Sequence, residues 1–265
     1  MFRSVRALVP PRAIVHFQQG DSVAERDSGA IIIAGHSHAA ALVGPSSHPE
    51  GDVCLLPVAG HDRIYGLHGP RLAGYAVRTG YYWTALAHYA PGNSIALFYG
   101  GNEHHANFLF EQAPRFDFVP KGLQSLPVEA DAVIVSESLI RAKFRSLLGS
   151  PLQGLLAYLT RQAHSRIALI GTPPPRRDYA GFQSLFISDH PQVKLTSSIK
   201  LLKLWHVLQE ILREQAEGNG VEFIAVPDGI ADEDGFLKPE FTDTDATHGN
   251  QAYGQLMLNY LAQRL

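Results

Sequence analysis

Short apolar runs rich in β-branched residues recur along the chain, and segments with helical spacing separate them. The clearest run is Ala30-Ile31-Ile32-Ile33-Ala34, which is typical of a strand buried on both faces. The predicted strands span residues 30–34, 52–58, 94–99, 132–135, 166–170 and 221–226. Strands that alternate with helices predict an α/β domain whose parallel sheet is covered by helices on both faces.

The strongest helical pattern lies in residues 197–217, where apolar side chains repeat every three or four positions and Gly218-Asn219-Gly220 marks the end. Gly149-Ser150-Pro151 predicts a break between two shorter helices. The other predicted helices span residues 37–42, 81–89, 139–148, 152–163 and about 251–265. Residues 1–28 show no sustained period, so we expect an N-terminal extension followed by one domain over residues 29–265.

Composition restricts the classes of partner. A net charge of −3 over 265 residues provides no general attraction to nucleic acid or anionic lipid, and no apolar stretch is long enough to cross a bilayer. Cys54 is the only cysteine, so an intrachain disulfide cannot form. Pro10 and Pro11 interrupt the apolar residues near the N-terminus, so no signal-peptide core is expected and a cytoplasmic location is predicted.

The segment after the first predicted strand contains a candidate nucleophile. Ligands of parallel sheets bind at the carboxyl ends of the strands. In this chain the segment at the carboxyl end of the first strand is Gly35-His36-Ser37-His38-Ala39. The N-terminal N–H groups of the following helix would stabilise an oxyanion formed beside Ser37. Ser37 is therefore either a nucleophile or only the N-cap of that helix, and this segment alone does not decide between the two.

Further polar residues follow other predicted strands. Gly60 follows the second strand, and Gly100-Gly101-Asn102 follows the third. Glycines let the backbone approach a ligand, and an asparagine amide can donate to an oxyanion, although a tight turn with a capping asparagine has the same sequence.

An aspartate and a histidine precede the last helix. Asp245 and His248 are one helical turn apart, so the carboxylate can fix the imidazole tautomer. The alternative is an aspartate that caps the helix beside an incidental histidine.

Taken together, Gly35-x-Ser37, Gly60, Gly100-Gly101-Asn102 and Asp245-x-x-His248 stand in an order that resembles the SGNH hydrolases, also called GDSL-type esterases. The resemblance covers about residues 31–265. It implies a three-layer α/β/α sandwich with a flavodoxin-like parallel sheet. It also implies hydrolysis of carboxylic esters, such as acyl or O-acetyl esters, of a small-molecule or carbohydrate substrate, without a cofactor or metal.

The resemblance implies a role for each matching residue. Ser37 would be the nucleophile, His248 the base and Asp245 the acid that orients it. The oxyanion would bind to the N–H groups of Ser37 and Gly60 and to the Asn102 side chain. Gly66, Gly69 and Gly74 are alternatives to Gly60.

This sequence departs from the family pattern at two positions. His36 and Glu103 stand where the family usually has aspartate. Neither position is catalytic in the family scheme, so the departures bear on the subfamily and the substrate.

Four other functions are compatible with parts of the pattern. The same site could transfer an acyl group to an acceptor instead of water. Gly35-x-Ser37-x-Ala39 is close to the elbow of α/β-hydrolases. Six histidines fall in predicted strand-end loops and could bind a metal, although their spacing fits no metal motif: His36, His38, His61, His104, His105 and His248. A non-catalytic module that binds carbohydrate or a protein partner is the fourth.

Overall fold

The computed structural model describes residues 29–35, 37–43, 53–55, 64–67, 86–87, 90–162, 165–179 and 193–265. A six-stranded sheet lies at its centre, in the order β2-β3-β1-β4-β7-β8. The strands are β2 (Val53–Leu55), β3 (Ile64–Leu67), β1 (Ile31–Gly35), β4 (Ser94–Phe98), β7 (Arg166–Ile170) and β8 (Glu222–Ile224). Every neighbouring pair is parallel except β2–β3. The parallel strands therefore follow the flavodoxin-like order, as the sequence predicts.

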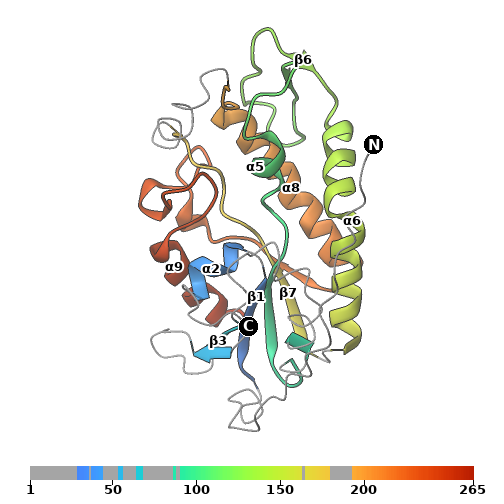
Figure 1. Ribbon diagram of the computed structural model, residues 1–265, viewed down its shortest axis with the longest axis vertical. Helices are drawn as coiled ribbons and strands as arrows, with labels where there is room; N and C mark the ends of the chain where they lie inside the picture. Colours follow the sequence, from blue (N-terminus) through green and yellow to red (C-terminus); the bar gives the residue numbers. More distant parts are fainter. Residues whose placement is uncertain are drawn as a thin grey trace, which may run out of the picture.

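Helices cover both faces of the sheet (Figure 1). On one face lie α2 (Ser37–Val43) and α9 (Gln251–Ala262). On the other lie α6 (Glu137–Gln162) and α8 (Ser198–Gly218), with α5 (Glu103–Phe108) packed against α8. Two short 3-10 helices, η1 (Asp228–Ile230) and η2 (Pro239–Phe241), precede α9.

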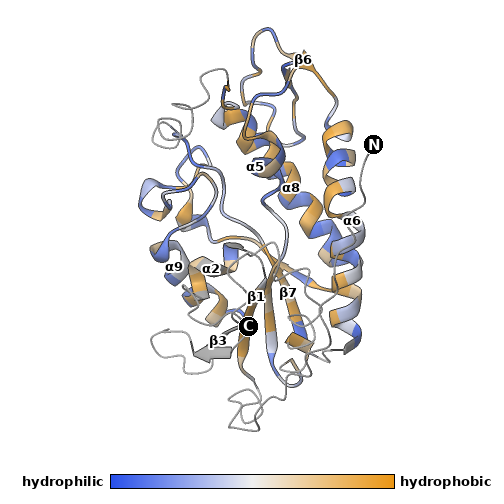
Figure 2. Cartoon of the chain, viewed as in Figure 1, coloured by the Kyte–Doolittle hydropathy of each residue, from blue (hydrophilic) through white to orange (hydrophobic). Residues whose placement is uncertain are grey.

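Side chains alternate between two hydrophobic cores along each central strand. In β1, Ile31 and Ile33 pack with α2 and α9, whereas Ile32 and Ala34 pack with α6 and α8. The central strands are accordingly mostly hydrophobic, with polar residues at the start of β4 and β7 (Figure 2). A strand with both faces buried has this pattern, so the predicted three-layer sandwich is confirmed.

Four predicted strands correspond to β1, β4, β7 and β8. The strand predicted at residues 52–58 exists in part, but the prediction that it joins the sheet as a parallel strand is wrong. The strand there, β2, is short and runs antiparallel to β3 at the sheet edge. The parallel neighbour of β1 is β3, whose run Ile64-Tyr65-Gly66-Leu67 does not stand out because it is short and contains a glycine.

Residues 132–135 were predicted to join the main sheet, and this is also wrong. β6 (Val133–Ile134) pairs with β5 (Phe116–Asp117) in a separate two-stranded sheet. Val133 and Ile134 are 55% and 56% exposed. A short apolar run indicates a strand without indicating which sheet it joins.

The predicted break at residues 149–151 is absent, since α6 is one helix with Pro151 inside it. Leu148, Leu152, Leu155 and Leu159 are all buried on one stripe that crosses the proline. An interior proline costs about 3 kcal/mol, while each buried leucine contributes roughly 1.5–3 kcal/mol. Burial of this stripe against the sheet therefore keeps the helix continuous.

The predictions for the last two long helices are confirmed. Ser197 caps α8 by accepting a hydrogen bond from the Lys200 N–H at 3.3 Å, and Gly220 follows its end with φ +67°. The predicted extension over residues 1–28 and most of the helix at 81–89 lie outside the described residues. Among the described helices, none is both long enough and apolar enough to span a bilayer.

Candidate active site

The sheet order brings two predicted site segments to the same edge. β1 and β4 are paired throughout, with Gly35 in register with Phe98. From β1 the chain moves to β3 on one side and then to β4 on the other, so a topological switch point lies between β1 and β4. Ligands bind at such a point, outside the carboxyl ends of the strands. Ser37 begins α2 directly after β1, and Gly100-Gly101-Asn102 directly follows β4.

The ends of β1 and β4 approach each other so closely that only glycine fits. Gly35 has φ +138°, and a Cβ at this position would lie 1.9 Å from the Phe98 carbonyl oxygen. A side chain would therefore force the two strand ends apart.

Asn102 does not have the capping role that the alternative interpretation gave it. It is the N-cap residue of α5, but its side chain makes no capping hydrogen bond. The Glu103 carboxylate instead accepts a hydrogen bond from the Gly101 N–H at 2.7 Å. Asn102 Oδ1 is buried and has no hydrogen-bond partner among the described residues. A buried amide atom without a partner requires an explanation, and a bound ligand is one.

The loop that carries Asn102 is fixed by residues from two other elements. Gly100 and Gly101 have φ of +75° and +91°. The Thr172 hydroxyl, just after β7, donates to the Gly101 carbonyl at 3.1 Å. Gln209 of α8 donates its side-chain N–H to the Thr172 hydroxyl at 3.0 Å and accepts from the Thr172 N–H at 3.2 Å. Two other parts of the fold thus hold this loop in place.

Asp245 and His248 form a directly hydrogen-bonded pair. His248 Nδ1 lies 2.6 Å from Asp245 Oδ2, while the N–H groups of Thr247 and His248 donate to Asp245 Oδ1 at 2.7 and 2.8 Å. Burial by itself raises the pKa of the Asp245 carboxyl, but these hydrogen bonds outweigh burial and lower the pKa below its ordinary value. The carboxylate is therefore ionised and holds the imidazole by Nδ1.

A different residue caps α9. The Asn250 side chain accepts hydrogen bonds from the N–H groups of Ala252 and Tyr253 at 2.9 and 3.1 Å. The alternative in which Asp245 caps the last helix is therefore wrong. Asp245 instead directs its carboxylate to the backbone and ring of its own loop.

The second ring nitrogen of His248, Nε2, is not engaged by Asp245. His248 Nε2 is buried without a hydrogen-bond partner among the described residues. The ring lies 5.0 Å, centroid to centroid, from His38, which directly follows Ser37. α2 and α9 are in close contact here, since a Cβ on Gly254 would lie 1.9 Å from the Ala41 carbonyl oxygen. The His248 ring therefore adjoins His38 of α2, whereas the Ser37 hydroxyl lies outside what the structure describes.

Two further histidines line this region and are neutral. His104 and His105 are 1% and 5% exposed, with ring centroids 4.1 Å apart. Burial, followed by the Arg176 charge, lowers the pKa of His105 to about 3. Burial and the neighbouring His105 and His38 lower the pKa of His104 well below its ordinary value. Both rings therefore remain neutral across the pH range in which an unperturbed histidine titrates.

No family model and no curated protein matches this chain. Several solved structures do. The periplasmic domain of a lipopolysaccharide acetyltransferase from Salmonella ser. Paratyphi A aligns with a TM-score of 0.50 and 15% identity, over 89% of this chain and 83% of that one. An acetylxylan esterase from Geobacillus stearothermophilus aligns with a TM-score of 0.48 and 11% identity, over 89% and 93% of the two chains. This chain has the fold of the SGNH hydrolases.

The SGNH fold excludes the α/β-hydrolase alternative, and the metal alternative stays open. In an α/β-hydrolase several strands precede the nucleophile, and in the described part of this chain none precedes β1. For the metal alternative, no group of three or more potential ligands gathers among the described residues. His36 and His61 lie outside those residues.

The glycine of the SGNH oxyanion site stays a prediction. Gly60 lies outside the described residues, between the end of β2 and the start of β3. The match to Gly60 depends on residues 52–58 being the parallel strand that leads into the site, whereas β3 is that strand. Of the alternatives, Gly66 is within β3, in register with Ile33, while Gly69 and Gly74 come after β3 and lie outside the described residues.

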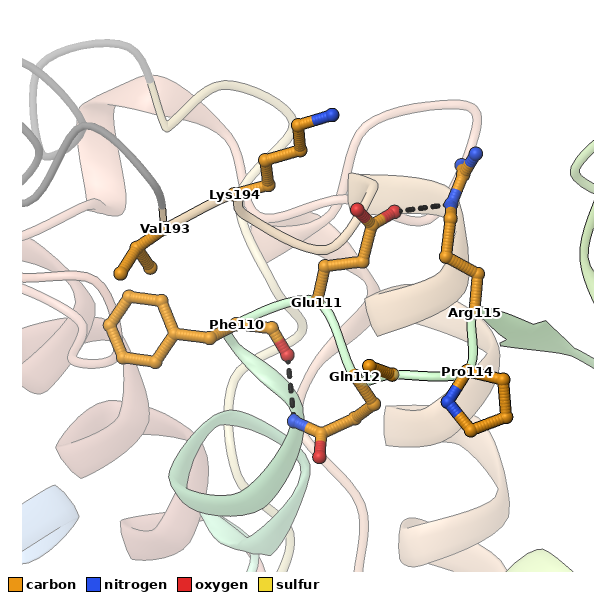
Figure 3. Close-up of a pocket in the computed structure, with 8 residues that line it drawn as sticks. Phe110, Glu111, Gln112, Pro114, Arg115, Val193 and Lys194 are labelled. Atoms are coloured by element: carbon orange, nitrogen blue, oxygen red, sulfur yellow. Dashed lines mark hydrogen bonds and ion pairs between the residues drawn. The ribbon is translucent and has the colours of Figure 1, made fainter.

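A surface hollow of about 590 Å³ lies near the end of α5, away from these residues. Phe110, Glu111, Arg115 and Lys194 are among its lining residues, and the Arg115 Nε donates to Glu111 at 2.6 Å (Figure 3). None of the predicted site residues lines it.

The sequence interpretation missed two residues beside the site, Arg176 and Tyr179. The Tyr179 hydroxyl lies 2.7 Å from His105 Nε2, and the Arg176 guanidinium reaches the loop that carries Asp245. Both follow the stiff run Gly171-Thr172-Pro173-Pro174-Pro175. That run directly follows β7, and its place at a strand end is the signal that could have directed attention to them.

Proposed function

We propose that this protein is a serine esterase of the SGNH family, with Ser37 as nucleophile, His248 as base and Asp245 as the orienting acid. The Asp245–His248 pair is the observation that supports this most. The carboxylate occupies Nδ1, which leaves the buried Nε2 as the nitrogen that can accept a proton. A general base needs such an acceptor nitrogen on the side of the ring that faces the group it deprotonates.

The proposed reaction has two steps. His248 Nε2 takes the proton of the Ser37 hydroxyl while the oxygen attacks the ester carbonyl, and the imidazolium then protonates the departing alcohol. The oxyanion is stabilised by the Ser37 N–H, by the Asn102 amide and by a glycine N–H, from Gly60 or from a glycine after β3. Water activated by His248 then releases the acid and regenerates Ser37.

The substrate that we propose is a small or carbohydrate ester. Acyl transfer is a second candidate, because the aligned Salmonella structure is that of an acetyltransferase domain. Both reactions share the acyl-serine intermediate, and they differ only in whether water or a hydroxyl of an acceptor attacks it.

The test is turnover of p-nitrophenyl esters of increasing acyl length, with and without an acceptor sugar. We expect hydrolysis of short esters by the parent protein and its loss in Ser37→Ala. Ser138→Ala, which alters an exposed serine hydrogen-bonded to Ser136, is the matched control and should retain activity. Acetylated sugar formed at the expense of acetate would favour the transferase. No turnover of any ester, or equal rates for parent and Ser37→Ala, would reject the proposal and favour a binding module.

A further inference from the structure

The loop that carries Asp245 and His248 is exposed at its tip. Asp243, Thr244 and Asp245 are all exposed residues. The loop closes on itself, since the Asp243 N–H donates to the His248 carbonyl at 3.0 Å. The carboxylates of Asp243 and Asp245 also accept hydrogen bonds from backbone N–H groups within the loop. These contacts shape the loop without fixing where it lies relative to the sheet.

Ala246 of this loop packs in the core, and one guanidinium supplies hydrogen bonds that join the loop to the segment after β7. Arg176 Nη2 donates to the Asp243 carbonyl at 2.8 Å and also to the Asp245 carbonyl. The two hydrogens on Nη2 allow one bond to each carbonyl. Within the described residues, Arg176 supplies the hydrogen bonds that reach residues 243–247 from another part of the chain.

The backbone of Arg176 is itself held firmly. It follows Pro173-Pro174-Pro175, whose rings fix φ and whose residues are buried. The Leu237 N–H donates to the Pro175 carbonyl at 3.0 Å, and Arg176 forms an isolated parallel bridge with Leu237. The guanidinium also lies 5.9 Å from the centre of the Tyr179 ring. The rigid segment of residues 171–176 thus runs from the end of β7 to the tip of the acid–base loop, residues 243–248.

We propose that Arg176 is a positioning residue that holds the Asp245–His248 pair where the His248 ring can reach the nucleophile, Ser37. This rests on the proposed function. Arg176 acts through the two carbonyls it binds. Without it the loop would keep its internal hydrogen bonds but lose its connection to β7, so the His248 ring would move relative to α2. Displacement of a catalytic group by about 1 Å can reduce turnover on the order of 10²-fold.

The chain offers a matched control in the next residue. Arg177 is equally charged but 52% exposed in its side chain, and it pairs with Asp232 at 2.9 Å and Asp234 at 2.6 Å. Exposed pairs of this kind contribute little to stability. Arg177→Ala therefore removes a charge from the same segment without touching the acid–base loop.

The first experiment compares the kinetics of Arg176→Ala, Arg176→Lys and Arg177→Ala on the best ester. We expect kcat of Arg176→Ala to fall on the order of 10²-fold while KM changes less than about threefold, since the substrate contacts are intact. Millimolar guanidinium should restore part of the lost kcat in Arg176→Ala, an effect that general destabilisation would not produce. Arg176→Lys, which cannot reproduce the two-carbonyl geometry of a planar guanidinium, should recover little. Arg177→Ala should match the parent.

A second readout does not depend on activity. The proton between His248 Nδ1 and Asp245 should give a far-downfield proton NMR resonance in the parent and in Arg177→Ala. We expect it to broaden or vanish in Arg176→Ala while the melting temperature stays close to that of the parent. Loss of the resonance in Arg176→Ala, in a protein that turns over no ester, would uphold the positioning role and reject the proposed function. Parental kcat and an unchanged resonance in Arg176→Ala would overturn the positioning role itself.

Discussion

Two groups of buried polar residues in this protein are built in opposite ways. The lysine cluster comprises Lys203, Asp117, Lys200 and Glu129. The Lys203 ammonium donates to Asp117 Oδ1 and Oδ2 at 3.0 and 2.9 Å and to the Pro127 carbonyl at 2.8 Å, so all three hydrogens are used. Asp117 also accepts from the N–H groups of Phe118 and Glu129, both at 2.8 Å.

The histidine cluster comprises His104, His105, His248 and Asn102. Both ring nitrogens of His104, Nδ1 of His105, Nε2 of His248 and Oδ1 of Asn102 are buried without a hydrogen-bond partner among the described residues. Buried polar groups are nearly always paired, so the lysine cluster follows the rule and the histidine cluster departs from it. We infer that the first stabilises the fold, whereas the second is open to a ligand if the proposed function holds.

The largest effect should follow removal of the base from the histidine cluster. We expect His248→Ala to reduce kcat/KM by about 10⁴-fold or more, because nucleophile and base act as one unit. Its free energy of unfolding should change by less than about 1 kcal/mol, since the lost hydrogen bond joins partly exposed side chains. Ester kinetics and urea unfolding of the same preparations check both numbers. If His248→Ala loses stability in proportion to activity, the histidine cluster stabilises the fold as the lysine cluster does, and the proposed difference between them is wrong.

The next largest effect concerns the lysine cluster, and it should appear in stability. Lys203→Met leaves the Asp117 carboxylate buried without its cation, so unfolding should become easier by about 3–5 kcal/mol. Folded Lys203→Met should hydrolyse esters at the parental rate. The control is Arg166→Ala, which breaks the exposed pair with Glu222 and should cost about 1 kcal/mol or less. Similar losses for both variants would show that the buried pair contributes nothing special.

A smaller effect is expected at the proposed oxyanion donor. Asn102→Ala should lower kcat by about 10²–10³-fold, as removal of one oxyanion donor does. The unfolding free energy should hold steady, because Asn102 makes no capping hydrogen bond. Asn107→Ala on the same helix, where the side chain donates to the Glu103 carbonyl at 3.0 Å, should instead leave kcat unchanged. Equal kinetics for the two variants would remove Asn102 from the site.

The smallest effect is a pH dependence of stability. The pKa of His105 is about 3 in the folded protein, against an ordinary value of 6.5. Between these values the unfolded chain binds more protons, so stability is fully present above pH 6.5 and is lost as the pH falls. The loss from His105 should reach about 2 kcal/mol between pH 8 and pH 5.

The measurement for this prediction is urea unfolding of the parent and of His105→Gln at both pH values. Glu103, whose pKa burial raises, contributes in the opposite sense, so the difference between the two proteins isolates His105. The parent should lose more stability on acidification than the variant does. Identical pH dependence would mean that His105 is not held neutral by burial.

Much of the fold could be predicted because it is encoded locally. β1, β4 and β7 are apolar runs buried on both faces, and α8 has one apolar stripe with a serine cap. β3 could not be found, because a four-residue run that includes a glycine becomes a strand only through its pairing with β1. The continuity of α6 through Pro151 likewise depends on burial that only the assembled sheet provides.

The candidate site shows the same division. Asp245 and His248 are three residues apart, so their hydrogen bond could be predicted from spacing. Arg176 meets Asp243 across 67 residues and Gln209 meets Thr172 across 37, and neither contact leaves a local pattern in the sequence. Ser37 and His248 are still farther apart in the sequence, and their pairing remains a prediction.

In the proposed mechanism the Ser37 hydroxyl attacks the substrate with His248 as its base. The direct test is labelling with a fluorophosphonate probe, which reacts with activated serines, followed by peptide mapping. We expect one labelled site at Ser37, strongly reduced in His248→Ala and unaffected in Lys203→Met. Labelling at another residue, or labelling of Ser37 that is indifferent to the loss of His248, would contradict it.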